Sequence, residues 1–109
     1  MRRGDVYWVD LEPARGSEAN KARPAVIVSN DAANRAAERA GRGVVTIVPI
    51  TSNTARVFPF QVLLTAADSK AQAEQVRAIA ADRLGRRIGQ IPDAVLRQLD
   101  DALRIHLAL

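Results

Sequence analysis

The strongest constraint on what this chain can fold into is a continuous apolar run from Gly43 to Ile50, Gly-Val-Val-Thr-Ile-Val-Pro-Ile. Its valine and isoleucine residues favour extended structure, and a short run that is apolar at successive positions is typical of a buried strand. Pro49 lacks a backbone N–H, so we expect a bulge or the end of the strand there. The run therefore predicts the central strand of a sheet.

Three other segments have the composition of strands. They are rich in β-branched, aromatic or leucine residues, they end at turn-forming residues, and they span residues 6–11, 24–29 and 59–65. Pro24 is predicted to be the first residue of its strand, where no hydrogen-bond donor is required. Residues 12–22 and 51–54 are polar and rich in turn-forming residues, which predicts exposed loops.

Two helices are predicted from capping residues and apolar spacing. Asn30 or Asp31 can cap a short helix that runs to about Ala40 and is closed by Gly41. The second helix is the last element, with Asp93 as its N-cap candidate. Its apolar stripe has helical spacing and consists of Leu96, Leu99, Leu103 and Leu107.

The stretch between the last predicted loop and this helix is less regular. Residues 66–70 resemble a turn, residues 71–81 fit a helix and a strand equally, and residues 83–91 favour a short basic strand around Ile88. Several short strands with one short and one terminal helix predict a single α+β domain over residues 1–109. We expect its sheet to be antiparallel and strongly curved or barrel-like.

The composition narrows the classes of function. The 109-residue chain has a formal net charge of +4 and a pI near 10.6, and 14 of its 16 basic residues are Arg. This balance favours an anionic partner such as nucleic acid, although an Arg-rich codon usage gives the same composition. With no Cys and a single histidine, His106, disulfides, thiolate nucleophiles and Cys-based or His-cluster metal sites are excluded.

Nothing in the sequence indicates a membrane or secreted protein. No run reaches the ~18–20 apolar residues of a membrane span, and residues 1–5 lead into the first strand without an apolar leader. We therefore expect a cytoplasmic protein. The chain also lacks a phosphate-binding glycine loop, a dinucleotide fingerprint and a His-Glu zinc motif.

These exclusions leave RNA cleavage without a metal open. In that reaction the RNA's own 2′-hydroxyl attacks, and the protein supplies a base, an acid and cationic support for the phosphorane. Within residues 16–24, Glu18 can accept a proton, and Arg23 stands at the start of a strand, where its guanidinium can hold a phosphate. The same two residues are also compatible with a surface pair of no consequence.

An ordered series of motifs makes the prediction specific. Along the chain they are Gly4–Leu11 with Glu12-Pro13, Gly16-Ser17-Glu18, Arg23–Asn30, Val48–Ser52 and Ala73–Ile79. In this order the chain resembles the MazF/PemK/Kid family, the toxins of bacterial toxin–antitoxin pairs. The resemblance covers the chain from about residue 3 to the terminal helix.

The resemblance implies both a fold and an activity. Members of the family have a small SH3-like β-barrel with added helices and act as homodimers. They are ribosome-independent endoribonucleases that cut single-stranded RNA at short motifs, leave 2′,3′-cyclic phosphate and 5′-hydroxyl ends, and use no metal or other cofactor. Their MazE-like antitoxins lay an extended acidic tail over the active surface, which suits a basic toxin.

The functional residues of the family carry over motif by motif. The Arg of its Arg-Pro pair matches Arg23, the Thr of its Val-Pro-x-Thr segment matches Thr51, and the Glu of Gly-Ser-Glu matches Glu18. The resemblance implies that Arg23 stabilises the phosphorane, that Thr51 hydrogen-bonds the phosphate, and that Glu18 or Glu74 is the base. The residues expected near the bound RNA are Ser17, Ser52, Asn53, Gln72, Glu74 and Gln75.

Three features leave alternatives open. Some relatives have His where this chain has Ser17, and Arg and Asp where it has Gln72 and Glu74, so the general base is not assigned. Trp8 suits either a base-stacking residue or an anchor of the core or of a dimer. A different function on the same fold is a gyrase poison of the CcdB type, which works through an aromatic residue near its C-terminus that this chain lacks.

Overall fold

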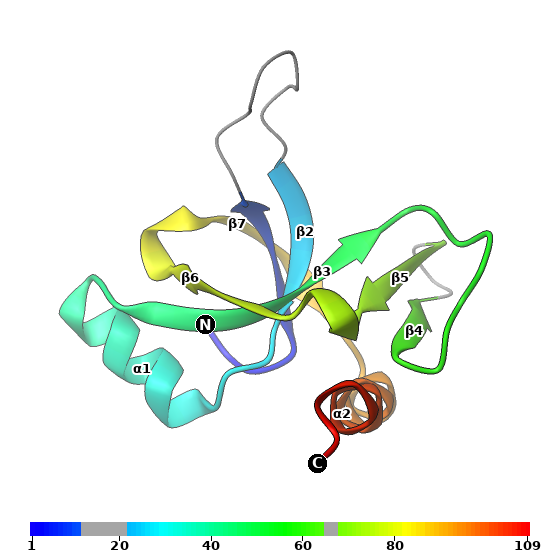
Figure 1. The fold of residues 1–109 in the computed structure, drawn as a ribbon. Helices are drawn as coiled ribbons and strands as arrows, with labels where there is room; N and C mark the ends of the chain where they lie inside the picture. Colours follow the sequence, from blue (N-terminus) through cyan, green and yellow to red (C-terminus); the bar gives the residue numbers. More distant parts are fainter. Residues whose placement is uncertain (12–21, 65–67) are drawn as a thin grey trace.

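The computed structural model describes residues 1–11, 22–64 and 68–109, and it has the expected α+β architecture (Figure 1). All strand pairings are antiparallel, in the order β4-β5-β3-β2-β1-β7, with β6 beside β3. These pairings form an open path from β4 to β7, so closure of the sheet into a barrel stays a prediction. The strands are β1 (Asp5–Asp10), β2 (Ala22–Ile27), β3 (Val44–Thr51), β4 (Gln61–Leu64), β5 (Ser69–Gln72), β6 (Arg77–Ala80) and β7 (Leu84–Gln90).

β3 is the central strand that the apolar run predicts. Its first half pairs with β6, its middle with β2 and its end with β5. Pro49 lies opposite Ala25 of β2. The part of β3 that pairs with β6 ends at Ile47, and the part that pairs with β5 begins at Ile50, so Pro49 lies between the two. The expected bulge or strand end is therefore wrong. Pro49 marks the place where β3 changes partners, and the strand continues to Thr51.

Alternate residues of β2 and β3 enter two cores on opposite faces of the sheet. The α2 core lies under the terminal helix α2 (Asp93–Leu107), and the α1 core lies beside the helix α1 (Asp31–Ala40). Both faces of β3 are therefore covered, which explains why the run is apolar at nearly every position. The α2 core takes Val26, Val48 and Ile50 from these strands, and the α1 core takes Ala25, Ile27, Val45 and Ile47.

α1 begins and ends where its capping residues predict. The Oδ1 atom of Asn30 accepts a hydrogen bond from the backbone N–H of Ala33 at 2.8 Å, which satisfies one of the free donors of the first turn. Gly41 closes the helix at a φ of 66°, a left-handed conformation that glycine adopts without steric cost. The short helix over residues 31–40 is thus confirmed.

α2 confirms the predicted terminal helix but begins with a different N-cap. Its N-cap is Pro92, and Asp93 is the first helical residue, where its carboxylate is favourable near the positive end of the helix. The carbonyl of Pro92 accepts the first helical hydrogen bond, from Leu96 N–H at 2.9 Å. Leu99 is fully buried whereas Leu107 is 49% exposed, so only the first turns of the apolar stripe are covered. Neither α1 nor α2 is long and apolar enough to cross a membrane.

The stretch that fits a helix and a strand equally contains short pieces of both. β5 is followed by a single 3₁₀ turn, η2 (Ala73–Gln75), and then by β6. A second turn, η3 (Ala81–Arg83), leads into β7, which pairs with β1 and confirms the strand expected around Ile88. Each piece is too short for a periodic pattern, which explains the ambiguity.

The turn predicted over residues 66–70 is wrong at its end. Ser69 and Lys70 are the first two residues of β5, opposite Leu64 and Leu63 of β4. Both are buried, which is uncommon for polar residues, and their polarity is the reason that the sequence favours a turn. Residues 65–67 lie outside the described parts of the chain.

Candidate active site

A hollow lined by both polar and apolar side chains opens where residues of β1, β2, β3 and β5 come together. Its volume is about 580 Å³. Of the residues that the sequence predicts for the site, Arg23, Thr51 and Ser52 share this hollow. The described residues that line it are Trp8, Ala22, Arg23, Pro24, Ile50, Thr51, Ser52 and Ser69.

Arg23 stands on β2 with its side chain exposed. It lies opposite Val9 of β1, and β3 joins β2 only from Ala25 onward. Within the described residues, Arg23 makes no hydrogen bond or ion pair. Its guanidinium therefore has a fixed root and five N–H donors open to a ligand, which is the arrangement that binds a phosphate well.

Thr51 is the last residue of β3 and is half-buried. Its Oγ1 atom accepts a hydrogen bond from the backbone N–H of Asn53 at 3.3 Å, which stabilises the turn after the strand. Because Thr51 accepts in this contact, its hydroxyl proton is still available to donate to a ligand. Ser52 is exposed at the rim of the hollow.

Trp8 and Pro24 form the apolar wall of the hollow. They are cross-strand partners on β1 and β2, and Trp8 is 36% exposed. Tyr7 packs against the α1 core on the other face, where burial raises the pKa of its phenol. The prediction that Pro24 is the first residue of its strand is wrong, because Pro24 is the third residue of β2. It is tolerated there because β3 pairs with β2 only from Ala25 onward.

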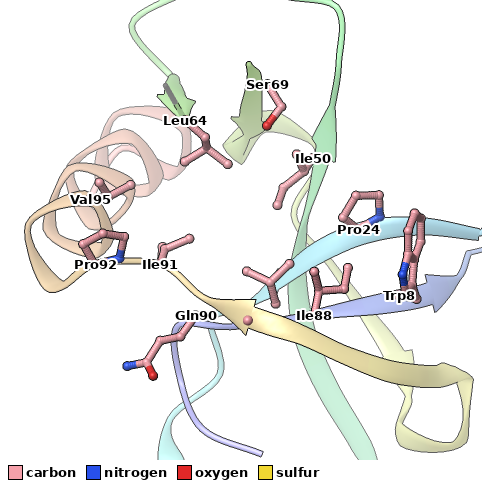
Figure 2. A pocket seen from close by; sticks show the side chains of 12 residues that line it. Trp8, Pro24, Ile50, Leu64, Ser69, Ile88, Gln90, Ile91, Pro92 and Val95 are labelled. Carbon is pink, nitrogen blue, oxygen red and sulfur yellow. The ribbon is translucent and has the colours of Figure 1, made fainter. Parts of the chain in front are cut away.

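A second, apolar cavity of about 410 Å³ adjoins the hollow (Figure 2). The two spaces share a wall made of Trp8, Pro24, Ile50 and Ser69. Figure 2 shows Trp8 and Ile88 on one side of the cavity and Val95 and Pro92 of the α2 region on the other. The rest of its lining consists of Val6, Leu64, Ile88, Gly89, Gln90, Ile91, Pro92 and Val95.

Among the described residues that line the hollow there is no carboxylate. Glu74 lies on η2, where its Oε2 atom accepts a hydrogen bond from Nε2 of Gln61 at 2.7 Å. Within the described residues, no three His, Asp or Glu side chains are grouped as a metal site requires. Of the other predicted residues, Asn53, Gln72, Glu74 and Gln75 do not line the hollow, and Ser17 and Glu18 lie outside the described residues.

Ser69 lines the hollow, and the sequence alone did not indicate it. It follows Asp68, which has a φ of 48°, and the local sequence favours a turn there. Ser69 is buried because it begins a strand opposite Leu64, a pairing that no local pattern announces. Its place in the site depends on the pairing of β5 with β3 and β4.

Comparisons with known proteins agree on one family. The family model described as PemK-like, MazF-like toxin of type II toxin–antitoxin system matches residues 2–107. Endoribonuclease MazF9 of Mycobacterium tuberculosis is 62% identical over 115 aligned residues, covering 100% of this chain and 98% of that protein. Endoribonuclease EndoA of Bacillus subtilis is 35% identical, with 100% of this chain and 96% of EndoA covered.

Solved structures agree with these matches. An endoribonuclease from a mycobacterial species, in complex with its cognate antitoxin, has a TM-score of 0.81 at 29% identity, covering 100% of this chain and 96% of that chain. MazF from Deinococcus radiodurans has a TM-score of 0.78 at 24% identity, covering 100% and 97% of the two chains, and shows the same fold.

Proposed function

Because the chain belongs to the family of PemK-like, MazF-like toxins of type II toxin–antitoxin systems, we propose that it is an endoribonuclease that cuts single-stranded RNA. The observation that carries the proposal is the hollow that Arg23 and Thr51 both line. MazF9 and EndoA, which align with the whole of this chain and are named endoribonucleases, support it. The alternative of a gyrase poison has no counterpart among the relatives described above.

In the proposed reaction the RNA supplies its own nucleophile. A ribose 2′-hydroxyl attacks the adjacent phosphorus, the bond from phosphorus to the 5′-oxygen breaks, and the ends are a 2′,3′-cyclic phosphate and a 5′-hydroxyl. Arg23 binds two oxygens of the phosphate and stabilises the negative charge that builds up on the phosphorane. The hydroxyl of Thr51 donates a hydrogen bond to a phosphate oxygen.

Two proton transfers complete the reaction: a base accepts the proton of the 2′-hydroxyl, and an acid protonates the leaving 5′-oxygen. We assign the base to Glu18, which the sequence places close before Arg23, with Glu74 as the second candidate. The scheme needs no metal, since Arg23 supplies the positive charge that a metal ion supplies in other nucleases. The residues proposed to contact the neighbouring nucleotides are Ser17, Ser52, Asn53, Gln72 and Gln75.

The proposed partners follow from the charge of the site. An acidic peptide carries negative charges like those of RNA, so the exposed Arg23 suits an antitoxin tail as well as the substrate. The mycobacterial endoribonuclease with the same fold is found with its cognate antitoxin, which supports such a partner. We also propose a cytoplasmic homodimer, for which exposed apolar side chains such as Ile105, at 57% exposure, offer contact surface.

Cleavage in the presence of a chelator tests the function. We expect the purified protein to cut single-stranded RNA in excess EDTA and to leave cyclic-phosphate and 5′-hydroxyl ends, measured by mass spectrometry of the fragments. A failure to cut any RNA contradicts the nuclease activity. Cleavage that EDTA abolishes contradicts the metal-free chemistry while leaving the nuclease activity in place.

A further inference from the structure

Ser69 is a buried polar residue without a hydrogen-bond partner. It is only 5% exposed, and its Oγ atom has no partner among the described residues. A hydroxyl in this state has lost its contacts with water and has gained none from the protein, which is unfavourable and rare. Such an exception calls for an explanation from function, and a ligand that completes the hydrogen bond is one.

The position of Ser69 indicates which ligand. It belongs to the wall that the hollow and the apolar cavity share, so it borders both the cavity and the space lined by Arg23 and Thr51. Figure 2 shows it between Leu64 and Ile50, with its hydroxyl turned toward the cavity. Among the described residues that line that cavity, it is the one with a hydroxyl; the other side chains with polar atoms are those of the exposed Gln90 and of Trp8, through its indole N–H.

On the basis of the nuclease function proposed above, we propose that Ser69 selects the base next to the cut by a hydrogen bond to its edge. The phosphate lies in the hollow on Arg23 and Thr51, and the adjoining nucleobase enters the apolar cavity. Trp8, Pro24 and Ile50 pack against the base, as aromatic and apolar side chains do with unpaired bases.

A nucleobase fits this site better than other groups of an RNA do. Its faces are apolar and its edge carries donors and acceptors, which matches a cavity with apolar walls and a single buried hydroxyl. A hydroxyl that pairs with one base edge is left without a partner by another, and a site of this kind rejects the wrong ligand strongly. Ser69 is therefore a specificity residue that touches the substrate without moving protons.

The test compares S69A with S29A, a matched serine variant remote from the site. Ser29 is hydrogen-bonded: its Oγ donates to Oδ1 of Asn34 at 2.5 Å and accepts from the N–H of Thr46 at 3.1 Å. Both variants are assayed on a randomised single-stranded RNA pool, with sequencing of the cut ends. Values of kcat/KM are then measured on four oligonucleotides that differ only in one base beside the cut.

We expect S69A to lose discrimination at one position, with kcat/KM for the preferred base falling about tenfold and the other bases changing little. Its Tm rises by about 2–5 °C because an unpaired buried hydroxyl is removed. S29A has the opposite pattern, a lower Tm with unchanged base preference.

Three results overturn the inference. The inference is refuted if S69A keeps the full base preference of the wild type. It is also refuted if S69A cleaves all four oligonucleotides more weakly by the same factor. A lower Tm for S69A shows that its hydroxyl is bonded within the protein and has the same consequence. In each of these cases the wild-type protein still cuts RNA, so the proposed nuclease function survives; a wild-type protein that cuts none refutes both.

Discussion

Two polar clusters of this molecule have opposite hydrogen-bond states. On α1, Asn34 is fully buried, its amide donates to the carbonyl of Ser29 at 2.9 Å, and its Oδ1 accepts from the hydroxyl of Ser29. Across the sheet, in the hollow, the guanidinium of Arg23 and the hydroxyl of Ser69 have no partner among the described residues. One cluster is complete without a ligand, and the other is not.

The difference separates groups that hold the fold from groups that await a substrate. A satisfied buried cluster stabilises the folded state, because losing one member leaves the others unpaired. An unsatisfied group lowers stability until a ligand completes it, and this is common at binding sites. Variants of the Asn34 cluster are therefore expected to lower stability and leave cleavage unchanged, and variants of the hollow to impair cleavage without a loss of stability.

The largest expected effect is that of R23A on cleavage. We expect kcat/KM to fall roughly 10²- to 10³-fold, because the phosphorane loses its cationic support. The Tm stays close to that of the wild type, since the side chain is exposed and makes no hydrogen bond or ion pair with another described residue. Initial rates on a single-stranded RNA oligonucleotide and thermal melts measure the two quantities.

R97A is the matched control for R23A. Arg97 is exposed on α2, outside both the hollow and the cavity, and its removal should leave kcat/KM within about twofold of wild type. If R97A and R23A cut RNA at similar rates, Arg23 has no special role and the assignment of the hollow as the active site is wrong.

The next effect in size is that of N34A on stability. We expect the free energy of unfolding to fall by about 2–4 kcal/mol, because the carbonyl and the hydroxyl of Ser29 both lose a partner and a buried space is left. Urea denaturation measures it. Cleavage by the folded fraction should equal that of the wild type.

N53A tests whether the effect belongs to the buried cluster or to any asparagine. Asn53 lies exposed in the loop after β3, where its Oδ1 accepts from Ala55 N–H at 3.3 Å. Its loss should cost no more than about 0.5 kcal/mol. Equal losses for N34A and N53A would remove the distinction between the two clusters.

The sequence predicts the parts of this fold that depend on local chemistry. The ends of α1 follow from the residues that cap it, Asn30 and Gly41, and the buried β3 follows from its apolar run. Arg23 and Thr51 are indicated as site residues by the family resemblance, although they stand far apart in the chain and only the pairing of β2 with β3 brings them to one hollow.

The parts that the sequence does not predict depend on distant partners. Ser69 and Lys70 are polar and follow a turn, so nothing local distinguishes them from loop residues; their burial comes from the pairing of β5 with β3 and β4. Pro49 would end an isolated strand, but β3 passes through it because the strands on either side differ. The proposed role of Ser69 depends on its position in the wall between the hollow and the cavity, and no sequence motif indicates that position.

The smallest expected effect is the acid dependence of the α1 end of the molecule. The backbone N–H of Arg3 donates to Oδ1 of Asp31 at 2.7 Å, and this bond holds the pKa of Asp31 below its ordinary value of 3.8. A carboxyl whose folded pKa is depressed stabilises the protein above the unfolded pKa, and this contribution is lost as the pH falls through the folded pKa. D31N should therefore show a flatter fall of the unfolding free energy below about pH 4 than the wild type does, measured by urea denaturation at a series of pH values. Equal slopes for D31N and the wild type would mean that the hydrogen bond from Arg3 to Asp31 contributes nothing to the free energy of unfolding.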